Sequence, residues 1–106
     1  ALAVFEEIKR EFEDLLGPEH PATTRTELAI VEMLTNLGRT QDARREVERL
    51  MDRGLESHFL TRALLAHASV VDDPRPDLER ILTLPDVAAT TQKIAREGLA
   101  SLDSAP

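Results

Sequence analysis

The chain of 106 residues carries 20 acidic and 13 basic side chains, and its formal net charge of −7 disfavours binding to the phosphates of DNA or RNA. It contains no cysteine, which excludes an internal disulfide framework and favours a reducing compartment such as the cytoplasm. No apolar run is long enough to span a bilayer, and 42% hydrophobic with 31% charged residues is typical of one globular domain.

The first sixteen residues carry apolar side chains at three- and four-residue spacing, which predicts an amphipathic helix over 1–16. Gly17 and Pro18 end this helix, because glycine favours the left-handed C-terminal cap and proline cannot continue the hydrogen-bond ladder. The chain opens inside a helical pattern, so we expect a domain cut from a longer protein or a processed start. The predicted apolar face consists of Ala1, Phe5, Ile8, Phe12, Leu15 and Leu16.

The stretch 16–53 predicts one antiparallel pair of helices, entered through a loop with two prolines and turned at Gly38. Thr23 or Thr24 is a candidate N-cap of its first helix, and Glu27 would complete a capping box with Thr24. Thr40 is the candidate N-cap of the second helix, over 41–53. The predicted buried faces are Leu28, Ile30, Val31, Leu34 and Leu37 on the first helix and Ala43, Val47, Leu50 and Met51 on the second.

The remainder of the chain predicts three more helices. A helix over 56–71 has two apolar stripes, which indicates burial on two sides: Leu55, Phe59, Ala63, Ala66 and Val70, and Leu60, Leu64, Leu65, Ala68 and Val71. A short helix over 76–82 turns Leu78, Ile81 and Leu82 inward and cannot extend through Pro85. A last helix over 86–102, N-capped by Asp86, is expected to bury Val87, Thr91, Ile94, Ala95, Leu99 and Leu102, and we expect 103–106 to fray.

The chain contains the motif Leu16-Gly17-Pro18-Glu19-His20-Pro21, followed by Thr23, then Leu37-Gly38-Arg39 and Ala43. This pattern resembles a tetratricopeptide repeat of the kinesin-light-chain-like type, common in large bacterial multidomain and regulatory proteins. A shift of 42 residues, which places Phe5 on Val47, and a shift of about 34 residues, which places Val31 on Leu65, also indicate a repeat.

The resemblance implies an all-α fold in which about six helices stack as antiparallel pairs in a short right-handed superhelix. On this basis residues 1–106 form a single domain. Residues 1–16 would be the second helix of a preceding repeat, 22–53 a complete repeat, 55–84 a degenerate repeat and 86–102 a capping helix.

No group of titratable or nucleophilic side chains predicts catalysis. A metal ion needs convergent ligands, and His20 has no partner at ligand spacing. His58 and His67 are nine residues apart, so we expect one surface and one half-buried histidine. A cation site at Asp72, Asp73 and Asp77 would lack EF-hand spacing, and no nucleophile elbow surrounds Ser57, Ser69 or Ser101. We therefore expect no enzyme, no metal ligand and no cofactor.

In the resembled family, the first helix of each pair lines a concave groove that binds peptides. By position, the groove residues would be Arg25, Leu28, Ala29, Glu32, Thr35 and Asn36. The family usually has an asparagine before a Leu-Ala pair to grip the peptide backbone, but Leu28 and Ala29 stand there and Ile30 and Val31 replace the pair. The resemblance thus implies either a groove for an apolar surface, such as a helix, or a repeat that only packs and spaces.

Three functions are open at this point. The first is a protein–protein interaction or scaffold module of a larger bacterial signalling or regulatory protein. The second follows from a resemblance of the first helix and its Leu-Gly turn to the helical activation domain of actinobacterial antibiotic regulators: an effector domain acting through self-association or polymerase contact. The third, a small helical enzyme, requires a convergent catalytic group that the sequence does not offer. A homodimer through an exposed Phe5–Phe12 face is compatible with the first two.

Overall fold

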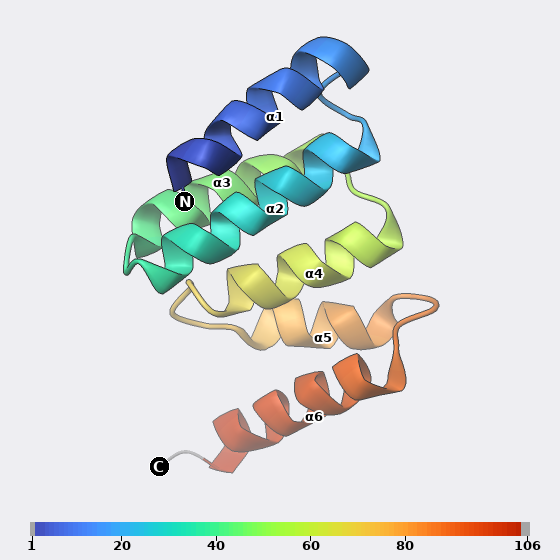
Figure 1. Cartoon of the computed structure of the whole chain (residues 1–106). Helices are drawn as coiled ribbons and strands as arrows, with labels where there is room; N and C mark the ends of the chain where they lie inside the picture. Colours follow the sequence, from blue (N-terminus) through green and yellow to red (C-terminus); the bar gives the residue numbers. More distant parts are fainter. Residues whose placement is uncertain (1, 105–106) are drawn as a thin grey trace.

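The computed structural model describes residues 2–104, which form six α-helices and no strand (Figure 1). The helices are α1 (Leu2–Leu16), α2 (Pro21–Asn36), α3 (Thr40–Arg53), α4 (Ser57–Ala68), α5 (Arg75–Thr83) and α6 (Ala89–Ser104). The predicted all-α class is therefore confirmed. Among these residues, no helix combines the length and the apolar character needed to cross a membrane.

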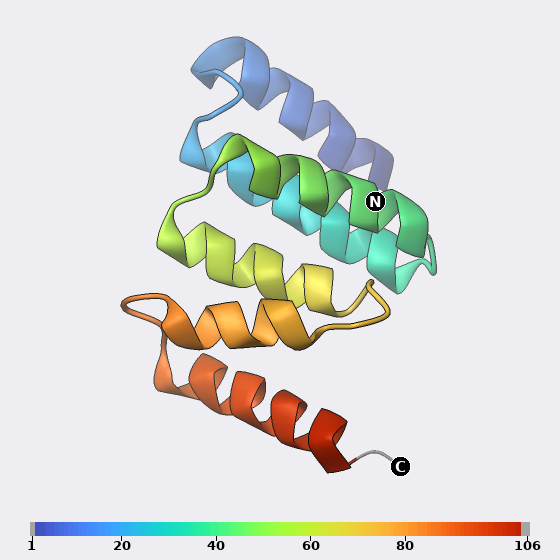
Figure 2. The ribbon, with the colours of Figure 1, turned by 180° about the vertical axis from the view of Figure 1, so that it is seen from behind.

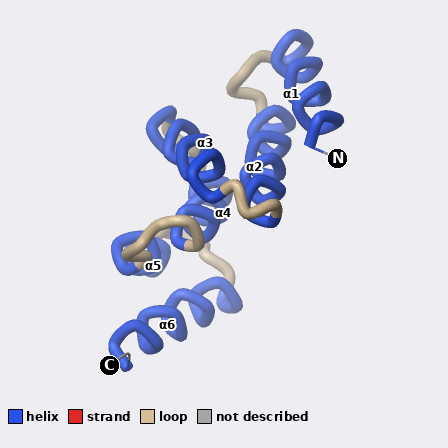
Figure 3. Tube along the Cα trace, turned by 90° about the vertical axis from the view of Figure 1, so that its left-hand side faces the viewer, coloured by secondary structure: helices blue, strands red, loops and turns tan. Residues whose placement is uncertain are grey.

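The helices are stacked in chain order, with α1 and α6 at opposite ends of an elongated molecule of 47 × 30 × 22 Å (Figures 1 and 2). Each helix packs against the next, and α2 also contacts α4. Figure 3 shows these two helices close together, with α3 and α5 to one side. Within the described range the backbones of α1 and α3 do not approach each other, so both flank α2 and leave a space between them.

The turn between α2 and α3 forms as the sequence predicts. Gly38 adopts a left-handed φ of 79°, and its N–H donates to the carbonyl of Thr35. The N–H of Arg39 donates to the carbonyl of Leu34, which completes a Schellman motif. Thr40 is the first residue of α3 rather than its N-cap, because Arg39 occupies the cap position. The tight turn places α3 antiparallel to α2.

The predicted capping box at the start of α2 is wrong. The helix already begins at Pro21, and His20 is its N-cap, with Nδ1 accepting the N–H of Ala22 at 3.1 Å. Proline is favoured at the first helical position because its missing N–H is not needed there. Thr24 and Glu27 instead lie inside the helix and face α3, where both contact Arg53.

The core divides into two clusters that share α4. The first cluster joins α2, α3 and one face of α4, and the second joins the other face of α4 to α5 and α6. The two-sided burial predicted for α4 is thereby confirmed. The first cluster contains Leu28, Ile30, Val31, Leu34, Ala43, Val47, Leu50, Phe59, Ala63 and Val70. The second contains Leu60, Leu64, Leu78, Ile81 and Ala95.

Several apolar residues expected in the core are exposed. Leu37 is 61% exposed because α2 ends at Asn36 and the turn rotates the next side chain outward. On α1, Leu15 is 80% and Leu16 is 47% exposed, since only α2 covers this helix within the described range. Phe5, Ile8 and Phe12 are half-buried, and Ala1 lies outside the described residues.

The C-terminal helices differ from the prediction mainly at their ends. α4 stops at Ala68 instead of residue 71, and α6 starts at Ala89 because Asp86 adopts a φ of 59° in the preceding turn and is not an N-cap. Ala95 is fully buried as predicted, but Ile94 is 54% exposed. α6 continues to Ser104, so the first half of the predicted frayed tail is helical, and 105–106 lie outside the described residues.

Candidate interaction surfaces

A groove of about 400 Å³ runs between the C-terminal halves of α2 and α4. One wall of the groove comes from α2 and the other from α4. The groove is lined by Glu32, Thr35, Asn36, Arg62, Leu65, Ala66 and Ser69.

An ion pair across the groove fixes the spacing of its walls. Arg62 on α4 binds Glu32 on α2 through two parallel bonds, Nε to Oε2 at 3.0 Å and Nη2 to Oε1 at 2.7 Å. The hydrogen bond to Glu32 outweighs burial and raises the pKa of Arg62 above its usual value, so the guanidinium stays charged. Two parallel hydrogen bonds fix the orientation of the guanidinium relative to the carboxylate, in addition to the attraction between their charges.

The remaining polar groups of the groove differ in their availability. The hydroxyls of Thr35 and Ser69 donate to carbonyls of their own helices, those of Val31 and Ala66. Asn36 is exposed, and its side-chain amide makes no hydrogen bond within residues 2–104. The groove therefore presents an apolar wall of Leu65 and Ala66, an ion pair and one amide that can both donate and accept.

The structure brings together three of the six predicted groove residues, Glu32, Thr35 and Asn36. Leu28 is 1% exposed and belongs to the core, so its side chain cannot contact a ligand. Ala29 is half-buried and does not line the groove. Arg25 is exposed near the start of α2, where its Nε lies 3.5 Å from the carbonyl oxygen of Pro21.

The α4 wall was not predicted. The repeat period holds the signal that could have found it, because a shift of about 34 residues places Leu28 on Arg62, Glu32 on Ala66 and Thr35 on Ser69. Transfer of the groove positions along the repeat would thus have identified three of the four residues of this wall, all but Leu65.

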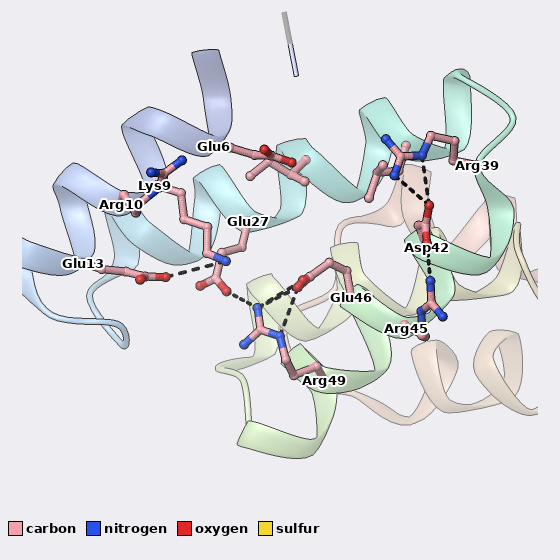
Figure 4. Close-up of a pocket in the computed structure, with 12 residues that line it drawn as sticks. Glu6, Lys9, Arg10, Glu13, Glu27, Arg39, Asp42, Arg45, Glu46 and Arg49 are labelled. Carbon is pink, nitrogen blue, oxygen red and sulfur yellow. Dashed lines mark hydrogen bonds and ion pairs between the residues drawn. The ribbon is translucent and has the colours of Figure 1, made fainter. Parts of the chain in front are cut away.

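A second and larger hollow, of about 480 Å³, lies between α1 and α3 (Figure 4). Its floor is the apolar pair Ile30 and Leu34 of α2, both 5% exposed. Its charged lining consists of Glu6, Lys9, Arg10, Glu13, Glu27, Arg39, Asp42, Arg45, Glu46 and Arg49.

The charges of this hollow are largely paired with one another. Lys9 bonds Glu13 along α1, Asp42 bonds Arg39 and Arg45, and Arg49 bridges Glu46 to Glu27 (Figure 4). Burial of Glu27 makes its pair with Arg49 structural, whereas the others follow the i,i+3 and i,i+4 spacing of solvated helix faces. A ligand here would have to displace these pairs, so this hollow is the weaker candidate.

The three histidines occupy different environments. His20 caps α2, and His58 is exposed with Glu56 3.8 Å away. His67 is half-buried, as the sequence predicts for one of the pair, and both of its ring nitrogens contact carboxylates. The sequence did not predict this contact, because the two carboxylates come from α3 and α5.

The other candidate polar residues are dispersed. Asp73 accepts the backbone N–H of Arg75, and Asp77 is buried against His67 rather than facing a loop. Among residues 2–104 no three His, Asp or Glu side chains are placed to hold one metal ion. Of the three serines considered for nucleophilic chemistry, Ser69 lines the groove.

No family model matches the sequence, and comparisons with curated proteins and with solved structures found no match either. The function proposed below therefore rests on the residues of this chain and on the resemblance of its repeat motif.

Proposed function

We propose that this chain is a non-catalytic protein–protein interaction module of the tetratricopeptide-repeat type. Its groove between α2 and α4 would bind a segment of a partner protein. The observation that carries the proposal is the combination, in one groove, of the apolar wall Leu65–Ala66 with the exposed amide of Asn36. We further propose a cytoplasmic location within a larger bacterial regulatory protein, in keeping with the absence of cysteine.

The chemistry of the groove favours a peptide or helix with one apolar anchor. An aliphatic side chain would pack on Leu65 and Ala66, and the amide of Asn36 would bond a backbone or side-chain polar group of the ligand. Charged ligand groups next to the anchor would contact the forked pair Glu32–Arg62, in which the unused N–H groups of Arg62 can donate and the remaining lone pairs of Glu32 can accept. The net charge of −7 disfavours a nucleic acid as the partner.

The test is selection of peptides from a random displayed library on the immobilised chain. Fluorescence anisotropy then compares binding of the selected peptides to the wild type and to Leu65→Glu, Asn36→Ala and Leu15→Glu. Leu15→Glu makes the same substitution on α1, which has no backbone contact with α4, and circular dichroism checks that Leu65→Glu still folds, because Leu65 is half-buried against the second cluster. We expect Leu65→Glu to weaken binding at least about tenfold, as loss of a central anchor does, and Asn36→Ala to weaken it less. Peptides that bind Leu65→Glu as tightly as the wild type would refute the proposal.

A second candidate function is supported by α1. Its exposed apolar side chains, Val4 at 55%, Leu15 at 80% and Leu16 at 47%, favour the alternative of an effector domain that acts through self-association. Light scattering over a concentration series measures this directly. A dimer that Leu15→Glu dissociates and Leu65→Glu does not would favour self-association through α1, and a monomer at all concentrations would remove this candidate.

A further inference from the structure

His67 lies where α3, α4 and α5 meet, and its side chain is 15% exposed. Nδ1 is 2.6 Å from Oδ2 of Asp77 on α5, and Nε2 is 2.8 Å from Oε2 of Glu48 on α3. The ring thus spans two carboxylates from helices that flank its own. This site is separate from the groove and from the hollow between α1 and α3.

The chemistry of this arrangement requires a doubly protonated ring. A neutral imidazole has one N–H donor and one acceptor nitrogen, and an ionised carboxylate only accepts. With a single ring proton, one nitrogen lone pair would face a carboxylate oxygen within hydrogen-bond distance. Both short contacts are favourable together only when His67 is the imidazolium cation.

The two carboxylates differ in how well they tolerate the loss of a donor. Oε2 of Glu48 also accepts from Nε of Arg44 at 3.1 Å, and the Glu48 side chain is 43% exposed. The Asp77 side chain is 11% exposed, and within residues 2–104 its carboxylate has no donor besides His67. Asp77 also lies in the first turn of α5, where the helix dipole stabilises negative charge. The proton between His67 and Glu48 is therefore the one that leaves.

We propose that Glu48, His67 and Asp77 form a proton-operated clamp between helices. With two ring protons, His67 ties α4 to both α3 and α5. After loss of the Nε2 proton, His67 keeps its hydrogen bond to Asp77 and loses the one to Glu48. The side chain then still joins α4 to α5 but no longer joins α4 to α3. The charged groups that face the ring in this device are Glu48 with its partner Arg44 from α3 and Asp77 from α5.

The electrostatics of the site agree with this geometry. Burial alone would lower the pKa of His67, but the hydrogen bonds to Glu48 and Asp77 outweigh it, and the pKa lies above the ordinary 6.5. The hydrogen bond from His67, followed by that from Arg44, lowers the pKa of Glu48 below its ordinary 4.5. Both shifts favour the charged pair.

The test is an NMR titration of the ¹⁵N-labelled chain that follows the ring nitrogens of His67. At a pH of about 5.5 we expect both nitrogens protonated, and at about pH 9 only Nδ1. Contacts between the ring and the Glu48 side chain should be lost over the same transition, whereas those with Asp77 should persist. Glu48→Gln should lower the midpoint of His67. Glu46→Gln is the matched control, because Glu46 lies on the same helix and pairs with Arg49 instead.

Each result decides the proposal. A midpoint below 6.5, a neutral ring protonated on Nε2, or equal midpoints in the wild type and Glu48→Gln would overturn it. Glu48 is exposed enough for its variant to fold, so the test does not depend on replacing buried Asp77.

Discussion

The two core clusters stabilise the α2–α3 pair and the α5–α6 pair unequally. The first cluster holds ten buried apolar residues around α2 and α3, and the buried carboxylate of Glu27 and its arginines add a polar network beside it. The second holds five, and α6 contributes one buried residue, Ala95, with the half-buried Leu99 and Leu102 packed against the cluster among the residues described. A helix in the middle of the stack has neighbours on several sides, whereas α6 packs mainly on α5. We therefore expect α5 and α6 to open before α2 and α3.

The largest expected effect comes from a cavity in the first cluster. Leu50 is fully buried, and Leu50→Ala should lower the free energy of unfolding by about 2–5 kcal/mol. The equally buried Ile81 is the matched position in the second cluster. Native-state hydrogen exchange should show that Leu50→Ala accelerates exchange throughout the molecule, while Ile81→Ala accelerates it mainly in α5 and α6. Equal acceleration of α2 and α3 by both variants would refute the comparison.

A smaller effect is expected from the polar network of the same region. Glu27 is 2% exposed and bonds Arg49 at 2.6 Å and Arg53 at 3.2 Å, and Arg53 also donates to Thr24. Arg53→Met leaves both buried acceptors short of a donor and should cost about 1–3 kcal/mol in urea unfolding.

The control for this variant is Arg45→Met on the same helix. The Arg45 side chain is 75% exposed and pairs with Asp42, so its loss should cost at most about 1 kcal/mol. If Arg53→Met costs no more than this control, the buried network does not stabilise the region.

The partners of Glu27 could not be predicted from the sequence. The capping box was predicted from the three-residue spacing of Thr24 and Glu27, which is a local rule. The arginines that bind Glu27 are 22 and 26 residues away, and such partners can be identified only once the two helices are packed. The helices themselves were predictable, because apolar periodicity requires no knowledge of the neighbours.

Burial was predictable only where a helix has neighbours on its apolar side. Val31 and Leu34, on the apolar stripe of α2, are buried as predicted, but Ile94 and Leu15 lie on outer faces of the terminal helices and are exposed. The groove has the same explanation. Position in the repeat predicts the three α2 residues that line it, but which neighbouring positions are instead covered by core packing, as Leu28 is, depends on the helices packed around α2.

The contacts of His67 with Glu48 on α3 and Asp77 on α5 contribute a stability that depends on pH. The folded pKa of His67 is raised, so its contribution is complete below the ordinary 6.5 and is lost as the pH rises through the higher folded value. The folded pKa of Glu48 is lowered, so its contribution is complete above 4.5 and is lost as the pH falls through the lower folded value. Wild type and His67→Gln should therefore differ most between pH 4.5 and 6.5.

The difference should be about 1 kcal/mol, since the clamp is partly exposed to solvent. Urea unfolding at several pH values measures it, and a double-mutant cycle with Glu48→Gln isolates the pairwise contribution. A difference that grows towards alkaline pH has the opposite sign and contradicts the assignment.

The smallest expected effect is also the sharpest test of how tightly α6 packs. A Cβ at Gly98 would lie 2.9 Å from Cδ1 of Leu78, so Gly98→Ala forces that methyl group to move. The substitution also gains about 1 kcal/mol of helix propensity. If one buried residue, Ala95, and two half-buried leucines hold α6 only loosely, Leu78 can shift and the two effects should cancel to within about 0.5 kcal/mol in thermal unfolding. Repeating the substitution in a Leu78→Ala background removes the contact and should reveal the full gain. A loss above about 1 kcal/mol for Gly98→Ala alone would mean that α6 packs on α5 as rigidly as a core helix does, and the α5–α6 pair would then be as firm as the α2–α3 pair.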